Sequence, residues 1–354
     1  MKTNVYNLWI SILSATMVAV FLIGILLGTQ KPQDKQVSNM NPTTVDENFN
    51  SLINTASAED YASLLEAMVK LRSEYSDTLK LFIPGKSVLG KDIPMLTMGN
   101  GEKKALVVGG IHAREHLTTK YLLRCIEDYS YALEKGDGIF GGYDLKALFE
   151  EYTVYVIPCV NVDGLSIILS QTDVKKGVYV DKLTEYKANY NGVDINRNFP
   201  LAWEKIDNGI TKPYGYFFRG PSAASEPETQ MLMDLCEKNA FSFMISVHVK
   251  GNCIFWGDNY NKEFNSIYKG FAEDIASVCG MYLPEPTKKA SSYGGGFENW
   301  FRHQYSRPGI CVELVDVECT IEPCTDENYI EFDTTVNYEK TKYILGAALS
   351  SSNL

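Results

Sequence analysis

His112 and Glu115 are the residues of this chain whose types and spacing point most clearly to chemistry. Two residues separate them in the run from Gly109 to His116. A third metal ligand is available from His248. Two histidines and one glutamate are the ligand set of a catalytic zinc, which keeps its fourth position open for water. Since the chain has only four histidines, the sequence predicts one Zn²⁺ per chain, bound by His112, Glu115 and His248.

A second zinc motif overlaps the first. Residues 112–116 also fit the pattern H-x-x-E-H, in which two histidines of one helix bind metal and the glutamate acts as a base. That helix would have to be running already at His112. Gly109 and Gly110 directly before it favour a strand-to-loop break instead. We therefore favour a structural or supporting role for His116 over metal ligation.

Glu313 and Arg114 are candidates for the catalytic steps. Glu313 lies in the apolar run 310–315, where a carboxylate is costly to bury without a partner or a task. A satisfied salt bridge is one explanation. The other is a general base beside a metal-bound water. Arg114, between the two predicted ligands, is placed to polarise a carbonyl.

Asn196 and Arg197 are candidates for binding a substrate carboxylate. They are neighbours in the run 193–200. An arginine beside an amide suits planar recognition of a carboxylate. The alternative is a loop held by surface polar contacts.

Composition narrows the class of protein. The chain has 354 residues and a net charge of −11, and this charge argues against nucleic acid as a partner because phosphates would be repelled. The eight cysteines form no C-x-x-C pair, so a cysteine-based zinc site is not expected. Cys319 and Cys324 flank a short loop and could pair in an oxidising compartment.

The N-terminus predicts attachment to a membrane. After a short segment, residues 1–7, residues 8–28 carry no charge and as a helix would span about 31 Å, roughly one bilayer core. We favour a retained single-pass anchor over a cleaved signal peptide, since no A-x-A-like site is present near its end. Residues 29–55 have the composition of a polar linker, and residues 56–350 are predicted to fold. The folded part is expected outside the cytoplasm, anchored to the cell membrane or, alternatively, secreted.

Hydrophobic patterns predict an α/β fold in which strands alternate with helices. The predicted strands are 80–83, 92–98, 105–108, 152–158, 241–247 and 309–314, and the predicted helices are 61–75, 117–131, 226–239 and 265–279. The candidate site residues fall at or beyond the carboxyl ends of strands. Ligands of α/β sheets bind at that edge.

These features together resemble the zinc carboxypeptidase family of the carboxypeptidase A type. The resemblance covers about residues 58–345. It is carried, in family order, by segments 85–94, 110–115, 161–164, 192–200, 219–221, 225–229, 246–248 and 313–314. It implies a three-layer α/β/α domain with a mixed, mostly parallel sheet of roughly eight strands. It also implies zinc on His112, Glu115 and His248, Glu313 as base and acid, a substrate carboxylate on Asn196 and Arg197, and Arg114 at the scissile carbonyl.

The chain departs from the family pattern at two positions. The second carbonyl-polarising arginine is replaced, with Lys187 as its best match, and a lysine loses the bidentate fork of an arginine. The place of the mobile tyrosine that closes over substrate falls near Ser291, so a shifted loop would have to present Tyr293. The specificity position two residues before Trp300 is Glu298, and an acid there favours a cationic side chain.

The resemblance is greatest to bacterial γ-D-glutamyl-meso-diaminopimelate peptidases. Diaminopimelate has an amine for Glu298 and a carboxylate for Arg197. The sequence thus predicts a metallopeptidase acting near a free C-terminal carboxylate in peptidoglycan-derived peptides, with a cell-wall muropeptide as its partner. The alternatives are a general carboxypeptidase for C-terminal basic residues and, in another class, a non-catalytic cell-wall-binding module.

Overall fold

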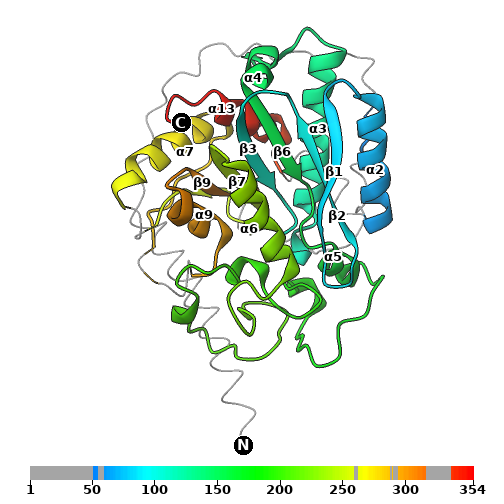
Figure 1. Ribbon diagram of the computed structural model, residues 1–354, viewed down its shortest axis with the longest axis vertical. Helices are drawn as coiled ribbons and strands as arrows, with labels where there is room; N and C mark the ends of the chain where they lie inside the picture. Colours follow the sequence, from blue (N-terminus) through cyan, green and yellow to red (C-terminus); the bar gives the residue numbers. More distant parts are fainter. Residues whose placement is uncertain (1–50, 55–59, 259–261, 288, 290–293, 316–335) are drawn as a thin grey trace, which may run out of the picture. The chain divides into compact units, whose positions relative to one another are not determined.

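The computed structural model describes residues 51–54, 60–258, 262–287, 289, 294–315 and 336–354. Its core is a seven-stranded sheet of order β1-β2-β6-β3-β7-β9-β8 (Figure 1). The strands are β1 (Leu79–Lys86), β2 (Asp92–Met98), β3 (Lys103–Val108), β6 (Tyr152–Ile157), β7 (Phe243–His248), β8 (Cys253–Phe255) and β9 (Gly309–Glu313). A separate two-stranded sheet joins β4 (Ile139–Phe140) to β5 (Tyr143–Asp144).

The sheet is mixed, which confirms the predicted α/β class. Its central strands β6, β3, β7 and β9 are parallel, while β2 and β8 run antiparallel to their neighbours. The described part of the chain contains seven strands in this sheet, where the resemblance implied about eight. The unpredicted strand β8 has only three residues, too few for an alternating pattern to be detected.

Helices cover the sheet. The longer ones are α2 (Tyr61–Glu74), α3 (Leu117–Glu134), α6 (Pro227–Asn239), α7 (Asn265–Cys279) and α9 (Phe297–Tyr305), and the shorter ones are α4 (Leu145–Glu151), α5 (Val162–Ile168), α12 (Tyr338–Thr341) and α13 (Ile344–Leu349). Every residue of β7 is buried, and so are the last four of β3. Because successive side chains point to opposite faces of a sheet, burial of all of them means that both faces are covered. This is why these strands have uninterrupted apolar sequences.

Helix α9 is fixed to the sheet by a buried arginine. The Nε of Arg302 donates to Asp258, 3.0 Å away, and both side chains are almost fully buried. The same guanidinium donates to the carbonyl of Gly309 at the start of β9 and to Asn299. A buried guanidinium with several acceptors holds an element in one position. The first turn of α9 is therefore held in a defined position beside β7 and β9.

The end of the predicted linker packs against α3. Ser51 Oγ and the Leu52 amide each donate to the carboxylate of Glu127, at 2.5 Å. Ile53 is buried, and Lys120 donates to the carbonyl of Asn54. Residues 51–54 are therefore bound to the folded domain, and a shortened form of the protein would need to retain them.

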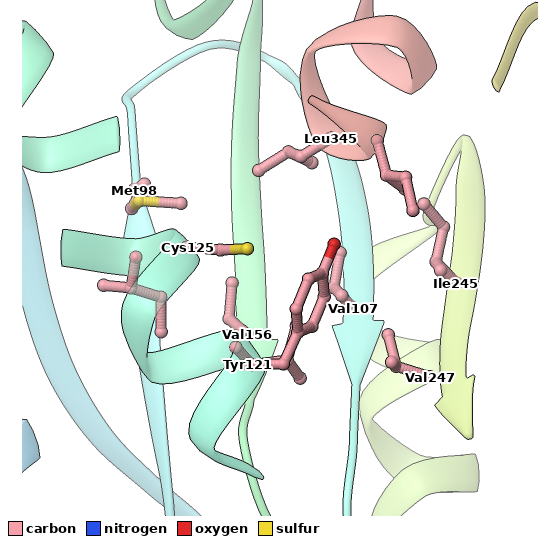
Figure 2. Close-up of a pocket in the computed structure, with 11 residues that line it drawn as sticks. Met98, Val107, Tyr121, Cys125, Val156, Ile245, Val247 and Leu345 are labelled. Atoms are coloured by element: carbon pink, nitrogen blue, oxygen red, sulfur yellow. The ribbon is translucent and has the colours of Figure 1, made fainter. Parts of the chain in front are cut away.

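A small cavity lies between α3 and the sheet (Figure 2). Its volume is about 30 Å³, and apolar side chains from the sheet, α3 and α13 line it. The hydroxyl of Tyr121 donates to the carbonyl of Thr341, so the tyrosine is already engaged. The cavity is a gap in core packing.

Several predictions fall outside the described residues. They are the anchor (8–28), most of the linker, Tyr293, and the pairing of Cys319 with Cys324. Within the described ranges, no helix combines the length and the apolar character needed to span a bilayer. The six described cysteines are free: Cys125, Cys159, Cys236, Cys253, Cys279 and Cys311.

Candidate active site

A sharp turn at the end of β3 brings His112 and Glu115 together. Gly110 has φ +58°, and a Cβ there would lie 2.9 Å from Cys159, so only glycine fits this turn. His112 is extended, and the 3₁₀ turn η1 (Ala113–Glu115) follows it. The two side chains thus face one another from a loop. The overlapping H-x-x-E-H alternative required a continuous helix, and the structure excludes it.

Both histidines approach the carboxylate of Glu115 through the same ring nitrogen. His112 Nδ1 lies 2.9 Å from Oε1, and His248 Nδ1 lies 2.8 Å from Oε2. His248 is the last residue of β7. All three side chains are buried, and their ligand atoms lie within 4.8 Å of one another. The structure brings together the three predicted ligands, although they are up to 136 residues apart (248 − 112).

Asp194 contacts the cluster of His112, Glu115 and His248 through the other ring nitrogen of His112. Its Oδ1 lies 3.2 Å from His112 Nε2 and accepts a hydrogen bond from the backbone N–H of Asn196. Burial would raise the pKa of Asp194, but the adjacent His112 and Arg197 hold it below its usual range. An ionised carboxylate behind a histidine fixes the tautomer that offers Nδ1 to a metal.

The donor set fits zinc. Two imidazole nitrogens and one carboxylate converge, and metal ligands of this kind leave an open coordination position. His112 is also buried beside a supporting carboxylate, as metal-binding histidines commonly are. His116 is buried nearby, but it is not part of this group. Burial lowers the pKa of His116 to about 4, which keeps its imidazole neutral at pH 7.

Glu313 lies next to the predicted ligand His248. It ends β9 and is paired with His248 across the parallel strands β7 and β9. Among the described residues, its Oε2 is a buried oxygen with no hydrogen-bond partner. Burial raises the pKa of Glu313 to about 7. A carboxylate that is near the cluster, buried and free to accept a proton is suited to general-base chemistry.

Lys187 reaches the cluster from another loop. Its Nζ lies 3.4 Å from Glu115 Oε1, and its side chain is 17% exposed. Backbone bonds hold this loop against η1: Ala113 N donates to Lys187 O, and Arg114 N donates to Tyr186 O. The side-chain amide of Asn161 also bridges Ile111 O and Ala188 O. These bonds therefore hold the Lys187 loop against η1, which carries Arg114 and Glu115.

Asn196 and Arg197 lie in a 3₁₀ turn, η3 (Ile195–Arg197). Asn196 Oδ1 accepts a hydrogen bond of 2.7 Å from the Phe297 amide at the start of α9. Arg197 donates to the Asn196 carbonyl and lies over the ring of Phe217. With Oδ1 engaged, Asn196 is oriented to offer its Nδ2. Since Asp194 contacts both this turn and His112, the turn and the metal cluster are one connected unit.

Comparison with known families decides which class of protein has this site. The profile described as "Zinc carboxypeptidase" matches residues 64–336. The chain belongs to the zinc carboxypeptidase family. It is a metallopeptidase, and its cofactor is zinc. Sequence comparison thus confirms the predicted family, enzyme class and metal.

Two curated relatives of this zinc carboxypeptidase are bacterial. It is 29% identical over 274 residues to the Gamma-D-glutamyl-L-diamino acid endopeptidase 1 of Lysinibacillus sphaericus, covering 74% of this chain and 67% of the relative. It is 32% identical over 250 residues to the uncharacterized protein YqgT of Bacillus subtilis, covering 65% of this chain and 63% of that protein. The chain thus spans about two thirds of the length of these relatives.

Solved structures of similar shape establish the fold. The carboxypeptidase A of Helicoverpa armigera superposes with a TM-score of 0.63 and 18% identity, over 85% of this chain and 76% of the other. At this identity the likeness supports the carboxypeptidase fold alone.

Two residues of the zinc carboxypeptidase site differ from the sequence predictions: Asp194 was not predicted, and Glu298 lies in unexpected surroundings. Asp194 was not predicted as part of the site, although an acid in the largely apolar stretch 193–195 was a signal. Glu298, predicted to face a cationic side chain, is buried in the first turn of α9, with Oε1 3.4 Å from His248 Nε2. It therefore contacts a predicted zinc ligand.

Proposed function

We propose that this zinc carboxypeptidase hydrolyses peptidoglycan-derived peptides at the bond between γ-D-glutamate and meso-diaminopimelate. The observation that carries the proposal is the connection, through Asp194, of the zinc cluster to the Asn196–Arg197 turn. That connection supports a part for Arg197 in binding a substrate carboxylate next to the proposed hydrolytic centre. The relative from L. sphaericus, named as an endopeptidase for γ-D-glutamyl-diamino acid bonds, supports this substrate class.

Each residue of the site has a proposed part in hydrolysis. His112, Glu115 and His248 would hold zinc, which when bound acts as a Lewis acid and lowers the pKa of water. Glu313 would take a proton from the attacking water and give one to the leaving amine. Arg114 and Lys187 would place positive charge near the scissile carbonyl oxygen, where negative charge develops. Asn196 and Arg197 would bind the carboxylate of the substrate.

We propose that the enzyme works outside the cytoplasm, attached to the membrane by residues 8–28. Such a position would bring it to peptidoglycan. The uncharged apolar length of this segment supports the proposal. Tyr293 remains the proposed residue that closes over bound substrate.

Product analysis of two peptides tests the substrate. The full-length zinc-loaded enzyme, in detergent, is incubated with L-Ala-γ-D-Glu-meso-diaminopimelate and with a peptide ending in lysine, and products are identified by mass spectrometry. We expect release of diaminopimelate, blocked by a chelator and restored by zinc. Release of lysine alone would replace this proposal with the general carboxypeptidase. Cleavage of neither peptide by enzyme with bound zinc would contradict both and favour the wall-binding module.

A further inference from the structure

The surroundings of Glu298 differ from those expected of a residue that recognises a substrate side chain. Its side chain is 5% exposed, and that of His248 is 2% exposed. Ser246, completely buried, lies between them in the network: its Oγ is 2.8 Å from His248 Nε2 and also bonds to the Glu298 carboxylate. The outer nitrogen of His248 thus faces a serine hydroxyl and a carboxylate, while its inner nitrogen faces Glu115.

We propose that Glu298 is a positioning residue that orients the His248 imidazole toward zinc, through Ser246 and through the charge of its carboxylate beside Nε2. This inference rests on the proposed function because it assumes that His248 binds zinc through Nδ1. A ligating histidine commonly donates its other N–H to a carboxylate or carbonyl, which fixes the ring and raises its basicity. Asp194 Oδ1, 3.2 Å from His112 Nε2, takes the corresponding place at His112, so each histidine would have its own supporting acid.

The secondary structure fixes this arrangement. Ser246 and His248 are two residues apart on β7, so their side chains lie on the same face. Glu298 is in the first turn of α9, and that helix is held by the buried Arg302. Burial of a carboxylate is costly without a charged or hydrogen-bonding partner, and His248 with Ser246 supplies one. At 3.4 Å the direct Glu298–His248 contact is long for a hydrogen bond, and the Ser246 hydroxyl, 2.8 Å from Nε2, makes the closer contact with that nitrogen.

Two other roles make different predictions. Glu298 Oε1 is a buried oxygen without a hydrogen-bond partner among the described residues. It could accept the amine of a substrate side chain, as predicted from the sequence. It also lies in a group with His248 and Cys311 whose potential ligand atoms are within 4.8 Å of one another, which could hold a second metal ion. The experiment must separate positioning from these two roles.

Zinc affinity distinguishes a positioning role of Glu298 from substrate recognition and from binding of a second metal ion. The variants are Glu298→Gln and Ser246→Ala, with Glu66→Gln on the exposed face of α2 as the matched control. Zinc dissociation constants are measured by chelator competition, and zinc content by elemental analysis. Steady-state constants are measured at saturating zinc for whichever test peptide the wild type cleaves and for its analogue without the side-chain amine.

Positioning predicts that both variants bind zinc about 10–100-fold more weakly. The loss of kcat/KM should then be the same for the amine-bearing peptide and its analogue. Unchanged zinc affinity, with KM raised only for the amine-bearing peptide, would overturn the proposal in favour of substrate reading. Two zinc equivalents in the wild type and one in Glu298→Gln would overturn it in favour of a second metal. If the wild type cleaves no peptide, the proposed function fails, and the zinc affinities alone still decide the role of Glu298.

Discussion

Replacing Glu313 by glutamine should lower kcat by about 10²–10⁴-fold, the usual contribution of a general acid–base group, while zinc stays bound. Glu313 is the last residue of β9 and lies beside His248. One of its side-chain oxygens is buried and has no hydrogen-bond partner among the described residues. Glutamine keeps its size and cannot accept a proton from water. The fold and the metal ligands are left intact, so the loss should appear in kcat and leave zinc content unchanged.

The pH dependence of the wild type gives a second readout of the same group. Burial raises the pKa of Glu313 from 4.5 to about 7, and the charge of bound zinc would lower it again. Because the base works when ionised, kcat/KM should fall as pH drops through this pKa, somewhere between about 4.5 and 7. Glu66→Gln is the control. A Glu313→Gln enzyme with more than about a tenth of wild-type kcat would contradict the assignment of the base.

Replacing Glu115 by alanine should remove zinc and reduce hydrolysis to background. Each oxygen of Glu115 faces the Nδ1 of one histidine, so its loss takes the only carboxylate from the predicted ligand set. Two histidines alone fall short of the three protein ligands of a catalytic zinc site. The variant also leaves Lys187 without its buried counter-charge.

Zinc content after dialysis and circular dichroism test this expectation together. The matched control is Glu66→Ala. We expect the control to retain zinc and activity, and Glu115→Ala to keep its secondary structure with little zinc. Full zinc occupancy in folded Glu115→Ala would show that the metal is bound elsewhere.

The main elements of this fold were predictable because their patterns are local. The central strands have continuous apolar sequences, since both of their faces are buried, and α2, α3 and α7 were each predicted within a few residues. Helix α6 was predicted to begin at residue 226, but it begins one residue later, with Glu226 as N-cap and Pro227 in the first turn. Proline at that position costs the helix no hydrogen bond.

Helix α9 was less predictable. It is short, follows three glycines and contains the buried charges Glu298 and Arg302, which interrupt an apolar face. The partners of those charges, His248 and Asp258, are distant in the sequence. Only the folded chain brings each pair together.

The site residues also divide into those that the sequence could predict and those that it could not. His112, Glu115 and His248 could be predicted because their residue types define a zinc ligand set. Lys187 was found only through the family resemblance, and the backbone bonds that bring its loop to η1 have no sequence pattern. Asp194 was missed because its role depends on contact with His112, 82 positions earlier (194 − 112).

Diffraction from crystals of the zinc-loaded enzyme, recorded at the zinc absorption edge, tests the central claim most directly. We predict one anomalous peak per chain, about 2.0–2.2 Å from Nδ1 of His112, from Nδ1 of His248 and from the carboxylate of Glu115. A chain with no peak there, or with its zinc on His116 or on Cys311, would contradict the proposed metal centre.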